Sequence, residues 1–335
     1  MRVTFFSFKN YETEFFQNAN LDAQLDLNFL EVPLNIDTVE LARGSEAVCI
    51  FVNDNAKREV IELLEGMGVK LIALRCAGYN NVDLEAAEEK SIRIVRVPAY
   101  SPYSVAEHTL ALILTLNRKT HRAYNRVREG NFALGGLMGF DLNGKTVGLI
   151  GLGKIGAVAA KIFIGLGCRV LGYDVVRNTE CEAFGLEYAS LETLITTSDI
   201  ISLHCPLTPE THHIINNETL AKMKDGVMLI NTSRGGLIDS KAVINSLKIG
   251  KIGHLGLDVY EEEAHLFFQD LSEKVIQDDV FMRLLSFPNV LITGHQAFFT
   301  ENALTNIADI TLGNIVSYKE GSLLNEVKIE HVKVS

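Results

Sequence analysis

Apolar runs of strand length alternate with amphipathic stretches of helical length through residues 1–97. This alternation constrains the fold most, because neighbouring parallel strands need a long crossover connection and a helix supplies one. Residues 57–67 and 84–90 are the clearest candidate helices. The pattern predicts βαβ units whose parallel sheet contains strands at 3–8, 27–32, 47–52, 71–75 and 93–97.

The alternation of strand-like and helix-like segments is interrupted after Pro98 and then resumes as a second series. Residues 104–129 have the pattern of one long helix, which could bridge two domains or pack against a second subunit. A helix at 301–317 and a strand at 327–329 are predicted near the end of the chain. Between them six strands are predicted, as many as a complete dinucleotide-binding sheet contains, at 146–150, 169–173, 200–204, 227–231, 254–258 and 290–293.

The first strand of the second series runs into a glycine-rich turn, Gly151-Leu-Gly153-Lys-Ile-Gly156, and then into a helical stretch. Gly151 permits a tight turn, Gly153 lets a pyrophosphate approach the backbone, and Gly156 lets helix and strand pack closely. The helix N-terminus offers unpaired N–H groups to the phosphates. The next predicted strand ends at Asp174, 18 residues after Gly156, where a carboxylate binds ribose hydroxyls and repels a 2′-phosphate. These residues predict an NAD site.

Charge and cysteine usage argue against several classes of partner. The formal charge of −11 disfavours nucleic acid and anionic membranes, which bind clustered Lys and Arg. The longest apolar run, residues 109–116, is far shorter than the ~20 residues of a membrane span. Five irregularly spaced cysteines and the lack of a signal-peptide pattern lead us to expect a cytoplasmic protein with reduced thiols. The pairs His204-Cys205 and His212-His213 lack a second Cys or His cluster at zinc spacing, so no metal site is expected.

Polar residues follow three of the predicted strands, in the segments 231–236, 256–263 and 293–297. The carboxyl ends of parallel strands meet at one edge of a sheet, where such sheets bind their ligands. We therefore expect the polar residues of these segments to line one crevice.

The chain resembles the D-2-hydroxyacid dehydrogenase family over nearly its full length, and the bacterial D-lactate dehydrogenases most within that family. The motifs RCAGYNNVD at 75–83, VPAYSP at 97–102 and GHQAF at 294–298 carry the resemblance, together with the glycine turn. It implies an NAD-dependent enzyme that transfers hydride between NADH and a 2-oxo acid. It also implies which residues react or stand beside the nicotinamide: catalytic Arg234, Glu263 and His295, with Asp258 next to the ring.

Each catalytic role that the resemblance implies has a physical rationale. Hydride delivery to a C2 carbonyl builds negative charge on its oxygen, and His295 can protonate that oxygen because imidazole titrates near neutrality. A carboxylate at Glu263 favours the imidazolium form and fixes the ring. The choice of Glu263 over Glu261 and Glu262 rests on the resemblance. Arg234 offers a planar fork of donors that can hold the substrate carboxylate and polarise the carbonyl.

Further site residues are implied by the resemblance alone. The backbone N–H groups of Ala77 and Gly78, and Tyr100 opposite them, are expected to bind the substrate carboxylate. The bulk of Tyr100, Phe298 and Phe299 predicts a small substrate pocket that favours pyruvate over branched oxo acids. Additional cofactor contacts are expected at Lys154, Ile155, His204, Cys205, Pro206, Thr211, Thr232 and Ser233.

The family's architecture implies two parallel-sheet α/β domains, Rossmann-like and flavodoxin-like, with the active site in the cleft between them. The substrate domain is expected at 1–99 with 299–335, and the NAD-binding domain at 100–298. A homodimer through the 104–129 helix is implied, and a homotetramer stays open. Two alternatives remain: a related enzyme acting on glyoxylate, hydroxypyruvate or branched oxo acids, and an NAD-sensing regulator on the same fold.

Overall fold

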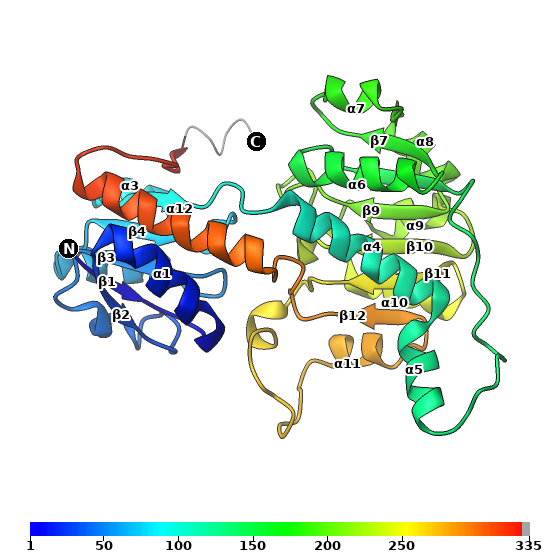
Figure 1. The fold of residues 1–335 in the computed structure, drawn as a ribbon, viewed down its shortest axis with the longest axis horizontal. Coiled ribbons are helices and arrows are strands. Elements are labelled where there is room, and N and C mark those ends of the chain that lie inside the picture. The colour runs from blue at the N-terminus through cyan, green and yellow to red at the C-terminus, as the bar shows by residue number, and fades with distance from the viewer. Residues whose placement is uncertain (330–335) are drawn as a thin grey trace. The chain divides into compact units, whose positions relative to one another are not determined.

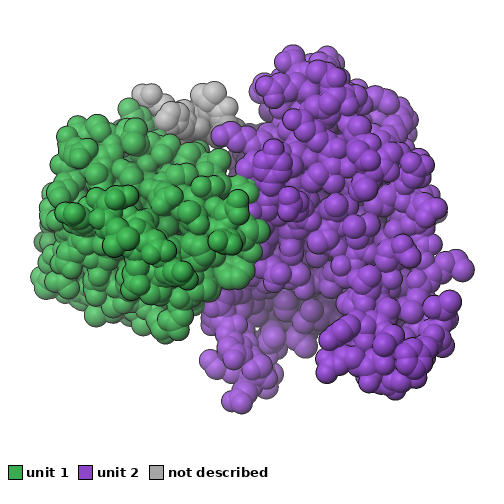
Figure 2. All heavy atoms as spheres, in the orientation of Figure 1, with its two compact units in different colours: residues 1–101, 299–335 green, residues 102–298 purple. Residues whose placement is uncertain are grey.

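The computed structural model describes residues 1–329 as two compact units, each built on its own sheet (Figure 1). Figure 2 shows unit 1, which contains Met1–Ser101 and the segment from Phe299, and unit 2, which contains Pro102–Phe298. Within the described residues, no helix is both long enough and apolar enough to cross a membrane.

Unit 1 is a five-stranded parallel sheet in the order β2-β1-β3-β4-β5. This is the flavodoxin-like, doubly wound order, and it confirms the predicted parallel sheet. All strands fall within the predicted ranges or start one residue earlier: β1 (Arg2–Phe5), β2 (Asp26–Phe29), β3 (Ala47–Ile50), β4 (Leu71–Leu74) and β5 (Arg93–Arg96). The helical elements are η1 (Asn10–Glu12), α1 (Thr13–Ala23), η2 (Val39–Ala42), α2 (Arg58–Gly66), α3 (Leu84–Glu89) and α12 (Glu301–Lys319).

Burial explains why these segments form strands and helices. Every residue of β3 and β4 is buried, as expected for central parallel strands covered on both faces. Helix α2 buries Val60, Ile61 and Leu64 along one stripe, which is the amphipathic pattern seen in the sequence. Helices α1 and α12 pack against each other, so α12 belongs to the N-terminal unit although it follows unit 2 in the sequence (Figure 1).

Unit 2 is a seven-stranded parallel sheet in the order β12-β11-β10-β9-β6-β7-β8. The order reverses between β6 and β9, which is the topological switch point of a dinucleotide-binding fold. The six predicted strands are present, and β8 is an additional edge strand of two residues that pairs with β7. The strands are β6 (Thr146–Ile150), β7 (Arg169–Tyr173), β8 (Glu187–Tyr188), β9 (Ile200–Leu203), β10 (Val227–Asn231), β11 (Ile252–Leu257) and β12 (Val290–Ile292).

Two hydrophobic clusters cover the two faces of this sheet. One packs α4 and α6 against it, and the other packs α8 to α11. The helical elements are α4 (Pro102–Arg118), α5 (Thr120–Arg128), α6 (Lys154–Gly165), α7 (Thr179–Ala183), α8 (Leu191–Thr197), α9 (Asn217–Lys222), η3 (Gly235–Leu237), α10 (Ser240–Lys248), η4 (Glu263–His265) and α11 (Asp279–Leu285).

Two predicted elements are wrong. The helix predicted at 104–129 is split at Lys119, whose left-handed backbone (φ 50°, ψ 38°) ends α4 and starts α5. The ammonium group of Lys119 donates to the carbonyl oxygens of Gly136 and Met138 and ties down the loop that follows α5. The strand predicted at 327–329 is reduced to one isolated bridge between Glu326 and Val95.

Candidate active site

The glycine turn of unit 2 has the shape of a phosphate cradle. Gly151 has a φ of 97°, and a Cβ there would overlap the backbone at Cys205. A Cβ on Gly156 would overlap the carbonyl oxygen of Gly151, so helix α6 can approach the turn only without a side chain there. Around Gly153, in contrast, a Cβ would meet nothing within 4 Å. Gly153 also offers no side-chain cap to α6, so the first N–H groups of the helix stay available to an anion.

Asp174 fixes the end of β7 beside the glycine turn. Its carboxylate accepts hydrogen bonds from the N–H groups of Leu152 (2.5 Å) and Val176 (3.1 Å). The nearby Arg177 is directed elsewhere, because its guanidinium pairs with Glu182 at 3.2 Å. The carboxylate of Asp174 is half-buried and forms no ion pair with a Lys or Arg of residues 1–329, which suits ribose hydroxyls and disfavours a 2′-phosphate. The turn and Asp174 therefore fit the NAD site that the sequence predicts.

The two side chains predicted to act as an acid–base pair, His295 and Glu263, contact each other in unit 2. Nδ1 of His295 lies 2.7 Å from Oε1 of Glu263, although 32 residues separate them. The other oxygen of Glu263 accepts from the N–H of Tyr260 at 2.9 Å, which fixes the carboxylate. Glu261 pairs instead with His213, whereas Glu263, the third glutamate of the acidic run, contacts His295. Nε2 of His295 is the ring nitrogen that points away from Glu263.

Asp258 holds the turn that carries His295. It is fully buried, and its carboxylate accepts from the Thr293 hydroxyl (2.5 Å) and from the N–H groups of Gln296 (2.9 Å) and Ala297 (2.8 Å). Its carbonyl oxygen accepts from the N–H of His295, whose φ of 55° is in the left-handed region. Nε2 of His108 on α4 lies 3.4 Å from the carboxylate. A short network therefore fixes the strained backbone at His295.

Arg234 follows β10 and is half-buried. Its guanidinium donates to the carbonyl oxygen of Ser233 at 2.7 Å. In the described part of the chain no carboxylate forms an ion pair with it. The next residue, Gly235, faces the backbone of Tyr260 and Glu261 so closely that a Cβ would overlap both. The loop after β10 and the loop that carries Glu263 are thus in direct contact.

The other predicted cofactor residues lie at the carboxyl ends of the same sheet. Hydroxyl groups tie these loops together: Thr232 lies 2.9 Å from Thr109, and Ser233 donates to the carbonyl oxygen of Cys205 at 2.7 Å. Nε2 of His204 lies 2.9 Å from the Ser202 hydroxyl, and burial lowers the pKa of His204 to about 4. Three more predicted contacts lie in the same region: Thr211, whose hydroxyl donates to the carbonyl oxygen of Pro206, and Lys154 and Ile155, which open α6.

The predicted substrate residues are divided between the units. Ala77, Gly78 and Tyr100 lie in unit 1, where their carbonyl oxygens accept from Arg96 (2.8 Å), Cys76 (3.2 Å) and Asn306 (2.6 Å) respectively. Phe298 is buried and ends unit 2, whereas Phe299 begins the second segment of unit 1. The meeting of these groups with Arg234 and His295 in one cleft stays a prediction.

Two groups that support the site, His108 and Gly235, were missed by sequence reasoning. His108 reaches Asp258 and Thr293 from α4, and no local pattern around residue 108 marks it. The role of Gly235 depends on a contact with residues 25 positions further along the chain. Both contacts form only in the folded chain, so no local sequence pattern predicts them.

Unit 2 combines a glycine-rich turn, a carboxylate at the end of the second strand and a His–Glu pair on one dinucleotide-binding sheet, which is the arrangement of an NAD-dependent dehydrogenase with acid–base chemistry. The model of the D-isomer specific 2-hydroxyacid dehydrogenase NAD-binding domain matches residues 110–297. The chain belongs to this family of D-2-hydroxyacid dehydrogenases, and NAD is its cofactor.

Individual relatives match almost the whole chain. It is 55% identical to a 2-hydroxyacid dehydrogenase homolog of Haemophilus influenzae, over 98% of this chain and 99% of the relative. It is 52% identical to the D-lactate dehydrogenase of Escherichia coli, over 96% and 98%. The solved structure of the pyruvate reductase of Chlamydomonas reinhardtii superimposes with a TM-score of 0.91, at 49% identity, over 97% and 98%.

Proposed function

We propose that the protein is a D-lactate dehydrogenase, which reduces pyruvate with NADH. The observation that carries the proposal is the 2.7 Å pair of His295 and Glu263 at the carboxyl end of the NAD-binding sheet. The names of the E. coli and C. reinhardtii relatives support lactate and pyruvate as the substrate pair. The small pocket expected from Tyr100, Phe298 and Phe299 supports the same choice.

In the proposed mechanism, bound NADH supplies the hydride that reaches C2 of pyruvate. Nε2 of His295 gives its proton to the carbonyl oxygen, while Glu263 stabilises the ring through Nδ1. The guanidinium of Arg234, which no described carboxylate engages, holds the substrate carboxylate and polarises the carbonyl. The products are D-lactate and NAD, and His295 regains a proton from solvent.

We further propose that unit 1 is the substrate domain and unit 2 the NAD-binding domain. The N–H groups of Ala77 and Gly78 bind the substrate carboxylate, with Tyr100 on its other side. Asp258 would stand beside the nicotinamide of the bound cofactor, and its carboxylate orders the turn that carries His295. Closure of the two units around the ligands excludes water before hydride transfer.

A homodimer through unit 2 is the assembly that the surface favours. Large apolar side chains are exposed on α4, α5 and the loop that follows: Tyr103, Leu114, Tyr124, Val127, Phe132, Leu134 and Met138. We propose that these side chains form the dimer contact, because large exposed apolar surfaces mark protein interfaces. Light scattering of the purified protein distinguishes a dimer from a tetramer.

We also propose that the protein works in the cytoplasm, where its five buried cysteine thiols would stay reduced.

Steady-state kinetics test the proposed reaction. Pyruvate and NADH are expected to give lactate of the D configuration, with a higher kcat/KM than glyoxylate, hydroxypyruvate or 2-oxoisocaproate. His295→Ala is expected to lower kcat by at least about 10²-fold while NADH still binds. Better turnover of a branched oxo acid would assign another substrate. NADH binding without turnover of any 2-oxo acid would instead point to a regulatory protein.

A further inference from the structure

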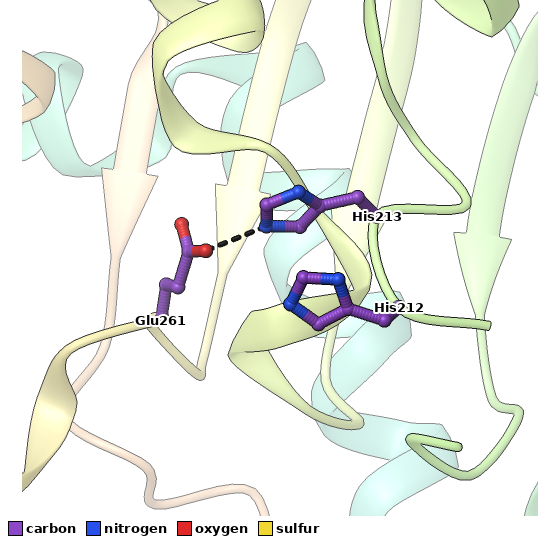
Figure 3. Close-up of side chains that lie close together, drawn as sticks. All are labelled: His212, His213 and Glu261. Atoms are coloured by element: carbon purple, nitrogen blue, oxygen red, sulfur yellow. Dashed lines mark hydrogen bonds and ion pairs between the residues drawn. The ribbon is translucent and has the colours of Figure 1, made fainter. Parts of the chain in front are cut away.

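Three side chains of types that can bind metal ions, those of His212, His213 and Glu261, lie close together in unit 2 outside the proposed acid–base pair (Figure 3). Nε2 of His213 lies 2.6 Å from Oε1 of Glu261, 48 residues further along the chain. The ring of His212 stacks on that of His213, with ring centroids 3.9 Å apart and planes 25° apart. One donor atom from each of the three residues lies within 4.8 Å of the other two.

The backbone at His213 explains why two adjacent histidines share one side. Successive side chains of an extended segment point in opposite directions. His213 has a φ of 51°, a left-handed conformation that a histidine seldom adopts. In Figure 3 both rings direct a nitrogen toward Glu261. Strain of this kind recurs at ligand sites, where the surrounding structure holds it in place.

The surrounding contacts hold the backbone of His213 and the carboxylate of Glu261 before any ligand arrives. The N–H of His213 donates to the carbonyl oxygen of Gly236, and its own carbonyl oxygen accepts from Asn216, both at 2.9 Å. Oε2 of Glu261 accepts from the Ser240 hydroxyl at 3.1 Å. The side chains of His213 and Glu261 are 32% and 27% exposed, so a solvated ion can reach them.

We propose that His212, His213 and Glu261 bind one divalent transition-metal ion, with zinc as the representative ion. Two imidazoles and one carboxylate form the donor set of open zinc sites, whereas calcium and magnesium prefer oxygen ligands alone. Zinc–ligand bonds of about 2.0–2.2 Å place tetrahedral ligand atoms roughly 3.3 Å apart. The His213–Glu261 pair therefore needs to open by less than 1 Å from its present 2.6 Å. Water completes the coordination.

The position of the site gives the bound ion an effect on the enzyme. His212 and His213 belong to the loop that follows β9, and Glu261 belongs to the loop that carries Glu263. An ion that joins these two loops opposes their separation. It is expected to raise the unfolding temperature and to restrain the loop on which the Glu263 carboxylate depends.

Calorimetric titration of the metal-free full chain with zinc chloride, without nucleotide, tests the site directly. We expect one high-affinity ion per chain. His212→Ala and Glu261→Gln should each weaken the affinity at least about tenfold, and the double variant H212A/H213A should abolish the high-affinity phase. Glu262→Gln is the matched control, because Glu262 is exposed, lies next to Glu261 and is outside the cluster. Its zinc affinity should equal that of the unmodified chain.

A second probe distinguishes this site from the five cysteine thiols. Bound Co²⁺ should show ligand-field bands of nitrogen and oxygen coordination, without a thiolate charge-transfer band. A thiolate band, a zinc affinity unchanged in H212A and E261Q, or no stoichiometric binding would each overturn the proposal. Thermal unfolding of the metal-free variants shows whether they are folded. The exposed His212 keeps the test informative if H213A is unstable. The binding test does not depend on the proposed enzymatic reaction.

Discussion

Gly235→Ala is expected to slow the proposed reaction although Gly235 makes no contact with a reacting atom. The added Cβ would overlap the carbonyl carbon and oxygen of Tyr260 and the nitrogen of Glu261. All three are backbone atoms, so the overlap cannot be relieved by rotating a side chain. Real Cβ atoms essentially never approach other atoms within 3.0 Å, and the loop after Tyr260 must therefore move by about 1 Å.

The displacement is transmitted to the acid–base pair through two hydrogen bonds. The N–H of Tyr260 donates to one carboxylate oxygen of Glu263 at 2.9 Å, and the other oxygen holds Nδ1 of His295 at 2.7 Å. A misplacement of 1 Å at a catalytic group costs about 10²-fold in rate. The steric overlap itself should reduce the free energy of unfolding by about 1–3 kcal/mol.

The assay is the oxidation of NADH with saturating pyruvate, combined with thermal unfolding of the same samples. Gly165→Ala is the matched control, because a Cβ at the end of α6 meets nothing within 4 Å. The control should keep its turnover and gain slightly in stability. A folded Gly235→Ala protein whose kcat stays within about threefold of the unmodified enzyme would refute the mechanical link between Tyr260 and His295.

Three further predictions concern other parts of the chain. Asp174→Ala should narrow the preference for NADH over NADPH by roughly 10- to 100-fold in kcat/KM, because a charged hydrogen-bond acceptor for the ribose is lost. An unchanged preference would show that Asp174 does not select the cofactor. The pKa of His204 is about 4 in the folded protein, whereas an unfolded histidine has a pKa near 6.5. Acidification from neutrality to about pH 5 should therefore lower the free energy of unfolding by about 2 kcal/mol through this residue. Denaturant titrations of His204→Gln should not show that loss. Arg75→Met should lower the free energy of unfolding by about 3–5 kcal/mol, because the buried carboxylates of Glu12 and Asp54 lose the buried cation beside them. A loss below about 1 kcal/mol would contradict the stabilising role of Arg75.

Much of the fold could be predicted because its strands are continuous apolar runs. The strands β6, β7 and β10 coincide with their predicted ranges, since buried parallel strands leave a strong local signal. Strand β8 was missed because two residues at the sheet edge produce no periodic pattern. The break at Lys119 was missed for a different reason. Only a left-handed backbone at one lysine separates α4 from α5, and the surrounding sequence favours a helix.

The candidate site was predictable to the extent that its signals are local. The glycine turn and Asp174 lie within one βαβ unit, so their spacing alone predicts a cofactor site. The pairing of Glu263 with His295 could not be derived from spacing, and its prediction required resemblance to a family. The pair His212-His213 was considered as a metal site and rejected from the sequence, because its third candidate ligand, Glu261, lies 48 residues beyond His213.

The buried Asp258 explains why the catalytic turn can hold an unfavourable backbone. A left-handed φ at His295 opposes folding unless neighbouring contacts stabilise it. Asp258 provides these contacts on both sides of the turn, through its carbonyl oxygen at His295 and through its carboxylate at Gln296 and Ala297. A neutral side chain of the same shape would lose the charge-assisted part of these bonds. Asp258, which follows β11, therefore contributes to the proposed reaction by positioning the imidazole of His295. This contribution does not depend on a contact between Asp258 and the nicotinamide.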